Sequence, residues 1–238
     1  MRLTVLGMNG PFPAPEGATS GYLVQAGETF IQLDMGSGVL AALTGRTAPE
    51  ELTALVLSHC HYDHACDVLP LLYRLEALGR RLTIYAPVDA GSPIRQAVLT
   101  SPAAELRDIV PGDRLELDGV TMTVYAAHHP VPAVMLRLTA GEAVLCYTGD
   151  TNTVPHLTAF AQGAGLLLAD GLFPMALWAE GKPHLSAAQA AELARDAGAR
   201  QVVITHLNPA IDPAALLAEA RAIRPDAVLA KRWQVYEV

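Results

Sequence analysis

The sequence contains no apolar run long enough to cross a membrane, although 51% of its 238 residues are hydrophobic. A membrane-spanning helix needs about 20 consecutive apolar residues, so we expect a soluble protein without a membrane partner. Positive charge is also scarce, with 16 Lys and Arg against 24 Asp and Glu and a net charge of −8. Because nucleic-acid backbones are bound through Lys and Arg, this balance argues against a general nucleic-acid surface, but it leaves room for a small phosphate ester.

Cysteine is rare as well, and Cys60, Cys66 and Cys146 form no Cys-x-x-Cys pair. An odd number of widely spaced cysteines does not indicate a disulfide framework. Residues 1–7 have the pattern of a strand and lack the apolar core and cleavage site of a signal peptide. We therefore expect a reducing, cytoplasmic location.

The densest polar cluster lies at residues 59–64, which read His-Cys-His-Tyr-Asp-His. The apolar run Leu52 to Ser58 before it is typical of a buried strand, and a helical pattern follows from Ala65 to Gly79. Three imidazoles and a carboxylate would be costly to bury without partners. The sequence therefore predicts a metal-binding loop between a strand and a helix.

This loop can serve two neighbouring ions. In such a turn His59 and His61 can point one way, and Asp63 and His64 another. Imidazole suits zinc, iron and copper, and a carboxylate adds charge and can hold a harder ion or orient a water. Asp63 is therefore a candidate both as a ligand and as a catalytic residue.

The rest of the chain shows strands interleaved with helices and no linker that would divide it. Asp118-Gly119 is a strong hairpin signal between two strand patterns, and Ser186 with Gln189 forms a capping-box pattern at a helix start. Residues 92–109 are expected to be helical in pieces broken by Pro102. The patterns predict one α/β domain spanning residues 1–238.

Further polar positions follow apolar strands directly, as His59 does. They are His128 or its neighbour His129, Asp150, Asp170 and His206. Strand ends at one rim of a sheet offer rigid supports for a site. The alternation along Val124 to Ala127 does not decide between the two histidines.

These motifs resemble the metallo-β-lactamase superfamily, and within it the ribonuclease Z group and its small bacterial relatives. The resemblance covers nearly the full length and rests, beside segment 59–64, on Thr19-Ser20, the Asp34-x-Gly36-x-Gly38 turn, His129-x-Val131-Pro132, Gly149-Asp150, His184-x-Ser186 and Thr205-His206-Leu207. It implies a four-layer αββα sandwich and a dinuclear metal site. The implied ligands of one ion are His59, His61 and His129, those of the other are Asp63, His64 and His206, and Asp150 bridges both.

The resemblance also implies a catalytic role for His184, which stabilises the transition state or protonates the leaving oxygen. Its acidic partner would be Asp170, at a position where the ribonuclease Z pattern usually has Glu. The shorter side chain leaves their direct pairing open. Asp34, at a strand end, either braces the metal loop or forms a plain turn.

The expected reaction is hydrolysis of a small or cyclic phosphodiester through a metal-bridging hydroxide. Two divalent ions about 3.5–4 Å apart lower the pKa of a shared water towards neutrality. Zinc is the default, and manganese or iron would also suit the ligands.

One alternative function is an acyl hydrolase of lactones or thioesters, and another is a non-catalytic metal- or ligand-binding regulator. Processing of tRNA is not expected. The bacterial ribonuclease Z enzymes that process tRNA carry a protruding arm between the third metal-binding His and the bridging Asp, whereas here only residues 130–149 separate His129 from Asp150. The Leu- and Ala-rich helix faces leave room for a homodimer, which the relatives in this group commonly form.

Overall fold

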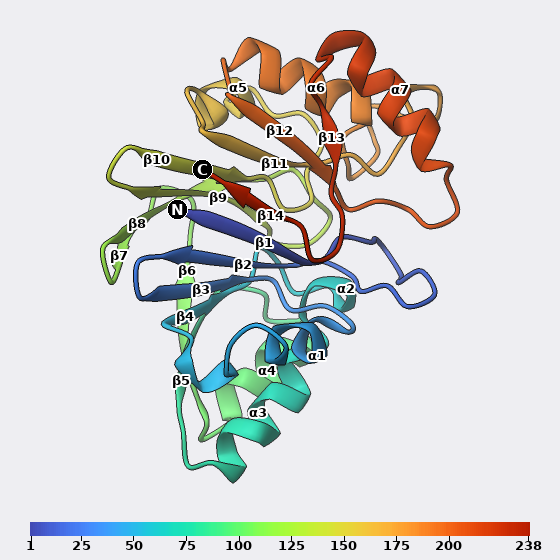
Figure 1. Ribbon diagram of the computed structural model, residues 1–238. Coiled ribbons are helices and arrows are strands. Elements are labelled where there is room, and N and C mark those ends of the chain that lie inside the picture. The colour runs from blue at the N-terminus through green and yellow to red at the C-terminus, as the bar shows by residue number, and fades with distance from the viewer.

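Two seven-stranded sheets face each other, with helices on both outer sides, in the computed structural model of residues 1–238 (Figure 1). The first sheet has the order β14-β1-β2-β3-β4-β5-β6 and the second the order β13-β12-β11-β10-β9-β8-β7. The α/β class and the four-layer αββα sandwich are confirmed. None of the helices is long and apolar enough to span a membrane.

The lower half in Figure 1 is built from the N-terminal part of the chain and one C-terminal strand. Its strands are β1 Arg2–Gly7, β2 Gly21–Ala26, β3 Thr29–Leu33, β4 Ala54–Val56, β5 Leu82–Pro87, β6 Ala104–Ile109 and β14 Val235–Glu237. Its helices are α1 Val39–Thr44, α2 Tyr62–Ala65, α3 Val68–Ala77 and α4 Pro93–Thr100, with a 3-10 turn η1 at Pro49–Glu51. Helices α1, α3 and α4 cover the outer face of this sheet.

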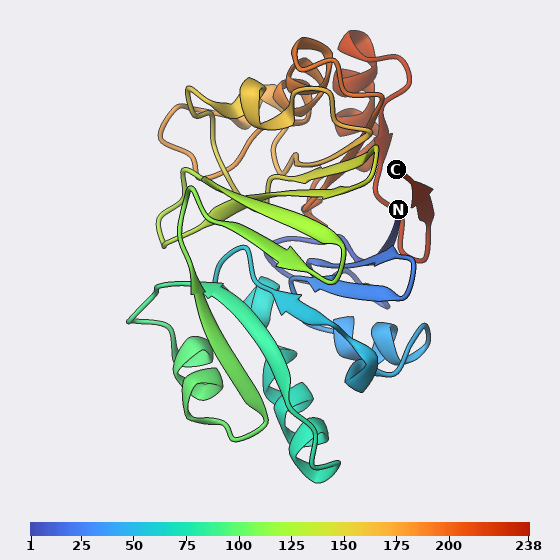
Figure 2. The ribbon, with the colours of Figure 1, turned by 90° about the vertical axis from the view of Figure 1, so that its left-hand side faces the viewer.

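The upper half contains the second sheet and the last three helices. Its strands are β7 Arg114–Leu117, β8 Val120–Ala126, β9 Val134–Ala140, β10 Ala143–Tyr147, β11 Leu166–Asp170, β12 Gln201–Thr205 and β13 Val228–Leu229. Its helices are α5 Leu157–Ala161, α6 Ala187–Asp196 and α7 Pro213–Ile223, with a 3-10 turn η2 at Met175–Leu177. Figure 2 shows the chain crossing from the lower to the upper sheet after β6.

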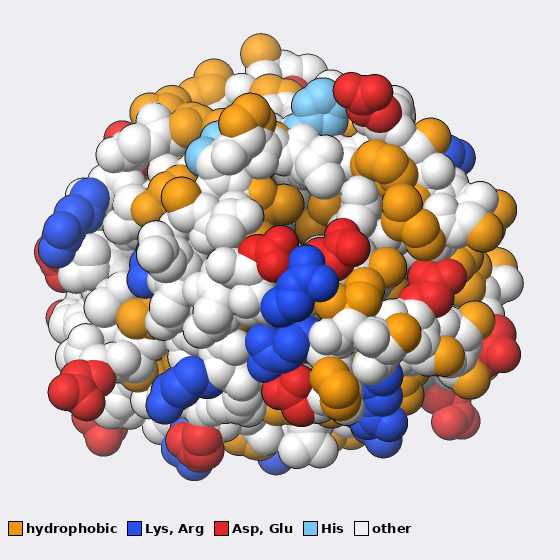
Figure 3. Space-filling view, turned by 90° about the horizontal axis from the view of Figure 1, so that it is seen from above, with side chains coloured by type: hydrophobic (Ala, Val, Ile, Leu, Met, Phe, Trp, Pro, Cys, Tyr) orange, Lys and Arg blue, Asp and Glu red, His pale blue; other side chains and the backbone are white.

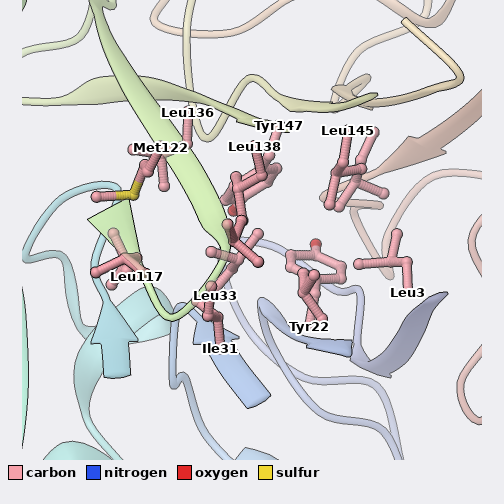
Figure 4. Packing of buried hydrophobic residues seen from close by; sticks show 14 of the residues in the cluster. Leu3, Tyr22, Ile31, Leu33, Leu117, Met122, Leu136, Leu138, Leu145 and Tyr147 are labelled. Carbon is pink, nitrogen blue, oxygen red and sulfur yellow. The ribbon is translucent and has the colours of Figure 1, made fainter. Parts of the chain in front are cut away.

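The main core lies between the two sheets. Figure 4 shows Tyr22 and Leu33 of the first sheet pointing towards Leu138 and Tyr147 of the second. This cluster contains 23 buried residues, and two more clusters of similar size lie beneath the helices. Both faces of each sheet are therefore buried, which explains why several strands are continuous apolar runs.

One predicted element is wrong: residues 104–109 form the edge strand β6 rather than part of a helix. Ala-Glu-Leu-Arg-Asp favours a helix locally. In the fold, however, β6 pairs in parallel with β5 from Leu82↔Ala104 to Pro87↔Ile109. Ile109 enters the core between the sheets and Leu106 packs against the helix layer, so tertiary pairing overrides the local preference.

Strand direction brings the polar strand ends to one rim. Strands β10, β11, β12 and β13 are mutually parallel, and so are β3, β4, β5 and β6. The segments that follow β4, β8, β10, β11 and β12 therefore meet at the same edge of the sandwich.

On the face above α5, α6 and α7, basic side chains lie among acidic ones rather than in a stripe (Figure 3).

Candidate metal centre

The loop after β4 presents its polar side chains in two directions. His61 has an extended backbone (φ −63°, ψ 153°) and immediately precedes the single helical turn α2, in which Asp63 and His64 lie. The change from extended to helical backbone separates the two pairs. One group of converging ligand atoms contains His59 and His61, and a second contains Asp63 and His64.

The first group is completed by His129. Nδ1 of His61 lies 3.1 Å from Nε2 of His59 and 3.1 Å from Nε2 of His129. Burial lowers the pKa of His129 to about 4 and that of His59 well below its ordinary value. Neutral imidazoles with converging nitrogens are what a divalent metal requires.

The structure distinguishes His129 from its neighbour. The side chain of His128 is exposed to solvent, and the segment is held by its backbone, whose N–H donates to Oγ1 of Thr151. His129 instead turns inwards, with Nδ1 3.2 Å from the carbonyl oxygen of Pro183 and Nε2 towards His61. Of the two candidates, only His129 joins the cluster.

The second group contains Asp63, His64, Asp150 and His206. Oδ1 of Asp150 lies 3.2 Å from Nε2 of His64 and 3.3 Å from Nδ1 of His206. Its other oxygen, Oδ2, lies 3.6 Å from Nε2 of His59 in the first group. Asp150 thus stands between the two groups.

Charge in this group is arranged around Asp150. Burial would raise the pKa of Asp150, but His206 and His64 hold it well below its ordinary value. Burial would likewise lower the pKa of His64, but Asp150 and Asp34 hold it well above its ordinary value. The surroundings therefore favour a carboxylate at Asp150 with positive charge beside it.

Three buried polar atoms of this group have no hydrogen-bond partner of acceptable geometry: Nε2 of His64, Oδ1 of Asp150 and Nε2 of His206. Leaving such a group unsatisfied costs about 1–3 kcal/mol. All three belong to side chains that converge on one point, and all are good ligands for divalent cations. The residues present therefore fit a metal ion.

Asp34 braces the metal loop from behind, rather than forming a plain turn. Its Oδ1 accepts from the backbone N–H of Ser58 (2.7 Å), and its Oδ2 from Oγ of Ser58 (2.7 Å), the hydroxyl of Tyr147 (2.5 Å) and Nδ1 of His64 (2.8 Å). Since Nδ1 of His64 is held by the carboxylate, Nε2 is left to face the second group. Asp34 is fully buried.

Nδ1 of His184 lies 2.9 Å from Oδ2 of Asp170, so the shorter aspartate reaches its partner directly. The ring stacks on His206 with centroids 4.9 Å apart, and Nδ1 is 3.8 Å from Oδ2 of Asp150. Burial would lower the pKa of His184, but Asp170 and Asp150 raise it to about 9. Burial in turn raises the pKa of Asp170 to about 6 against the opposing effect of His184.

Sequence reasoning missed Asn152, which organises the loop that carries His184. The amide of this buried side chain donates to the carbonyl oxygens of Ala179 (3.3 Å), Glu180 (3.1 Å) and Lys182 (2.5 Å). Its Oδ1 accepts from the indole N–H of Trp178, which also donates to the carbonyl oxygen of His184. No local pattern marks this asparagine, because its partners lie about 30 residues further along the chain.

Two other contacts position His206 and were also not predicted. Oγ of Ser20 lies 3.2 Å from Nδ1 of His206. Gly10 packs directly on the same ring, because a Cβ at this position would lie only 2.1 Å from it. The N-terminal loop thus forms part of the wall of the second group.

The chain is similar to known proteins over most of its length. A family model described as "Beta-lactamase superfamily domain" matches residues 21–207. The probable metallo-hydrolase YhfI of Bacillus subtilis is 33% identical over 213 residues, which cover 87% of this chain and 87% of YhfI. Ribonuclease Z of Methanopyrus kandleri is 28% identical over 262 residues, covering 95% of this chain and 94% of its own length.

The fold comparison agrees with the sequence comparison. The crystal structure of YhfI from Bacillus subtilis, a metallo-β-lactamase fold protein, superimposes with a TM-score of 0.94 at 32% identity. The match covers 100% of this chain and 98% of YhfI. The similarity therefore includes the whole sandwich and not only the metal loop.

Proposed function

This chain belongs to the metallo-β-lactamase superfamily and is a metal-dependent hydrolase, and we propose that it hydrolyses a small or cyclic phosphodiester. The observation that carries the proposal is the His184–Asp170 pair, 2.9 Å apart, beside the carboxylate of Asp150. A phosphodiester with an alkyl leaving group needs a proton on the leaving oxygen, and this pair would supply it. The name of the relative ribonuclease Z, an enzyme of RNA phosphodiester bonds, is consistent with this chemistry.

The site would hold two divalent ions, with zinc as the default and manganese or iron as alternatives. The proposed ligands are His59, His61 and His129 for one ion, Asp63, His64 and His206 for the other, and Asp150 for both. When bound, such ions generate a nucleophile from water near neutral pH and polarise the phosphoryl oxygen. In this proposal Asp63, whose side chain is about 12% exposed, also orients the attacking water.

In the proposed reaction the oxygen of water forms a new bond to phosphorus and the bond to the leaving oxygen breaks. Nε2 of His184, which makes no hydrogen bond within the chain, gives its proton to that oxygen, while Asp170 holds Nδ1. The proton that the attacking water loses passes to solvent. A linear diester gives a phosphomonoester and an alcohol, whereas a cyclic diester gives one phosphomonoester that carries the new hydroxyl group. Asp170 keeps the imidazole in one orientation and one tautomer during the transfer.

We do not propose tRNA as the substrate. The chain between His129 and Asp150 is occupied by the β9–β10 hairpin, which pairs from Leu136↔Tyr147 to Ala140↔Ala143. An arm that reaches a tRNA would have to be inserted in this segment. A small ester can bind at the rim of strand ends that carries the metal centre, and it needs no arm.

The test compares hydrolysis of bis(p-nitrophenyl) phosphate with that of a lactone and a thioester, using metal-analysed enzyme. We expect phosphodiester turnover in the wild type, loss of turnover and of metal in Asp150→Ala, and only a small fall in turnover with metal retained in His184→Ala, because p-nitrophenolate leaves without a proton. Turnover of the acyl substrates alone, unaffected by His184→Ala, would overturn the phosphodiesterase proposal. An acyl hydrolase is then the function that remains.

A further inference from the structure

A cavity of about 420 Å³ borders the first histidine group on the side of His129. Its walls come from the ends of β5, β6 and β8 and from the segment 129–134. A second cavity of about 320 Å³ borders His61, and Val131 lines both. The volume of the first cavity lies within the usual range for small-molecule sites, about 300–1,000 Å³.

The first cavity carries no acidic or basic side chain other than His129 itself. Four of its lining residues are prolines, namely Pro87, Pro111, Pro130 and Pro132. Proline fixes its own backbone angle φ, so this wall needs little ordering when a ligand binds. We call it the proline cavity.

Neither cavity offers a Lys or Arg to an anionic group. The single charged side chain among the residues lining the second cavity is Asp89, which would repel an anion. Protein sites for phosphate and carboxylate groups generally use Arg or Lys. A second phosphate or carboxylate of a substrate would therefore lose water here without gaining a partner.

His129 stands at the border between the proline cavity and the proposed proton donor, because its ring lines the cavity and lies 5.4 Å from the ring of His184. No residue of the loop 173–184 lines either cavity, whereas His184 lies in that loop. If His184 protonates the leaving oxygen, the leaving group lies on the loop side and the proline cavity faces the substituent that stays on phosphorus. This step depends on the proposed phosphodiesterase function.

We propose that the proline cavity binds an uncharged aromatic or apolar substituent that is retained on the phosphate, and so selects against substrates with a second negative charge. The occupant follows from the direct continuity of the cavity with His129, from its size and from its lack of charge. Val88 and Val110, which follow the neighbouring strands β5 and β6 at the mouth of the cavity, are 49% and 48% exposed. They are therefore suitable positions for adding a charge without disturbing the core.

The experiment compares phenyl p-nitrophenyl phosphate with 4-carboxyphenyl p-nitrophenyl phosphate, which share a leaving group and differ in one charge. We expect kcat/KM of the wild type to favour the phenyl ester by at least about tenfold, since the carboxylate is desolvated without a partner. Val110→Arg and Val88→Arg each place a cation at the cavity and should reduce this preference at least about threefold. Leu99→Arg is the matched control, because Leu99 is 55% exposed on α4 and lines neither cavity.

Three results would overturn the inference. Equal kcat/KM for the two esters in the wild type means that the cavity does not receive the retained substituent, while the phosphodiesterase function stands. An equal change in Val110→Arg, Val88→Arg and Leu99→Arg means that the effect comes from net charge rather than from the cavity. Absence of turnover of both esters by metal-loaded wild type removes the function and the inference together.

Discussion

Replacing Asp34 with Asn should weaken both the fold and the metal site, although the two side chains have nearly the same shape. Asp34 accepts four hydrogen bonds, three of them on Oδ2. If the amide oxygen takes the place of Oδ2, the amide NH₂ faces the backbone N–H of Ser58 across 2.7 Å. One hydrogen bond is lost and two buried donors oppose each other. The remaining hydrogen bonds become weaker, because their acceptor is no longer a charged carboxylate.

From about 1–3 kcal/mol for an unsatisfied buried donor and about 1 kcal/mol for the weakened bonds, we expect a loss of about 2–4 kcal/mol in the free energy of unfolding. Metal affinity should fall about 10–100-fold, because Nδ1 of His64 loses its carboxylate partner. Urea unfolding and metal titration measure the two effects. Asp89→Asn makes the same change on an exposed turn and should cost less than about 0.5 kcal/mol. Equal stability of the two variants, with unchanged metal affinity in Asp34→Asn, would refute the reasoning.

Two further substitutions and one alkylation rate test particular contacts and the burial of one thiol. Asn152→Ala removes three bonds to loop carbonyls, so we expect at least about a tenfold fall in kcat and faster proteolysis of that loop, with metal content unchanged. Gly10→Ala places a Cβ against the ring of His206 and should lower the measured metal content, whereas Gly181→Ala, with nothing within 4 Å, should not. Burial raises the pKa of the Cys60 thiol to about 11, so its alkylation at pH 8 should be at least about 100-fold slower than in urea; a rate equal to that of the unfolded chain would contradict the burial.

Much of the rim could be predicted because each polar residue follows an apolar run at a strand end. His59, Asp150, Asp170 and His206 all lie where such runs stop, and parallel strands bring these positions together. The strand pattern left the choice between His128 and His129 open, the family resemblance favoured His129, and in the structure His129 joins the cluster. Both lie just beyond Ala127, which follows the last residue of β8, and the path of the chain after the strand decides which ring turns inwards.

What the sequence does not reveal are contacts between distant segments. β6 is a strand because β5 offers it an unpaired edge, against a local preference for helix. The last two strands lie in different sheets, because β13 pairs with β12 in the second sheet and β14 with β1 in the first. Asn152 likewise acts through backbone carbonyls that no local pattern identifies.

The most direct test of the proposed mechanism is the effect of His184→Ala on kcat/KM across phosphodiesters whose leaving groups differ in pKa. p-Nitrophenolate leaves without a proton, whereas an alkoxide requires one. We predict a small loss for the p-nitrophenyl leaving group and a loss of about 100-fold or more for an alkyl leaving group, with metal content unchanged. A loss of the same size for every leaving group would contradict the assignment of His184 as the proton donor.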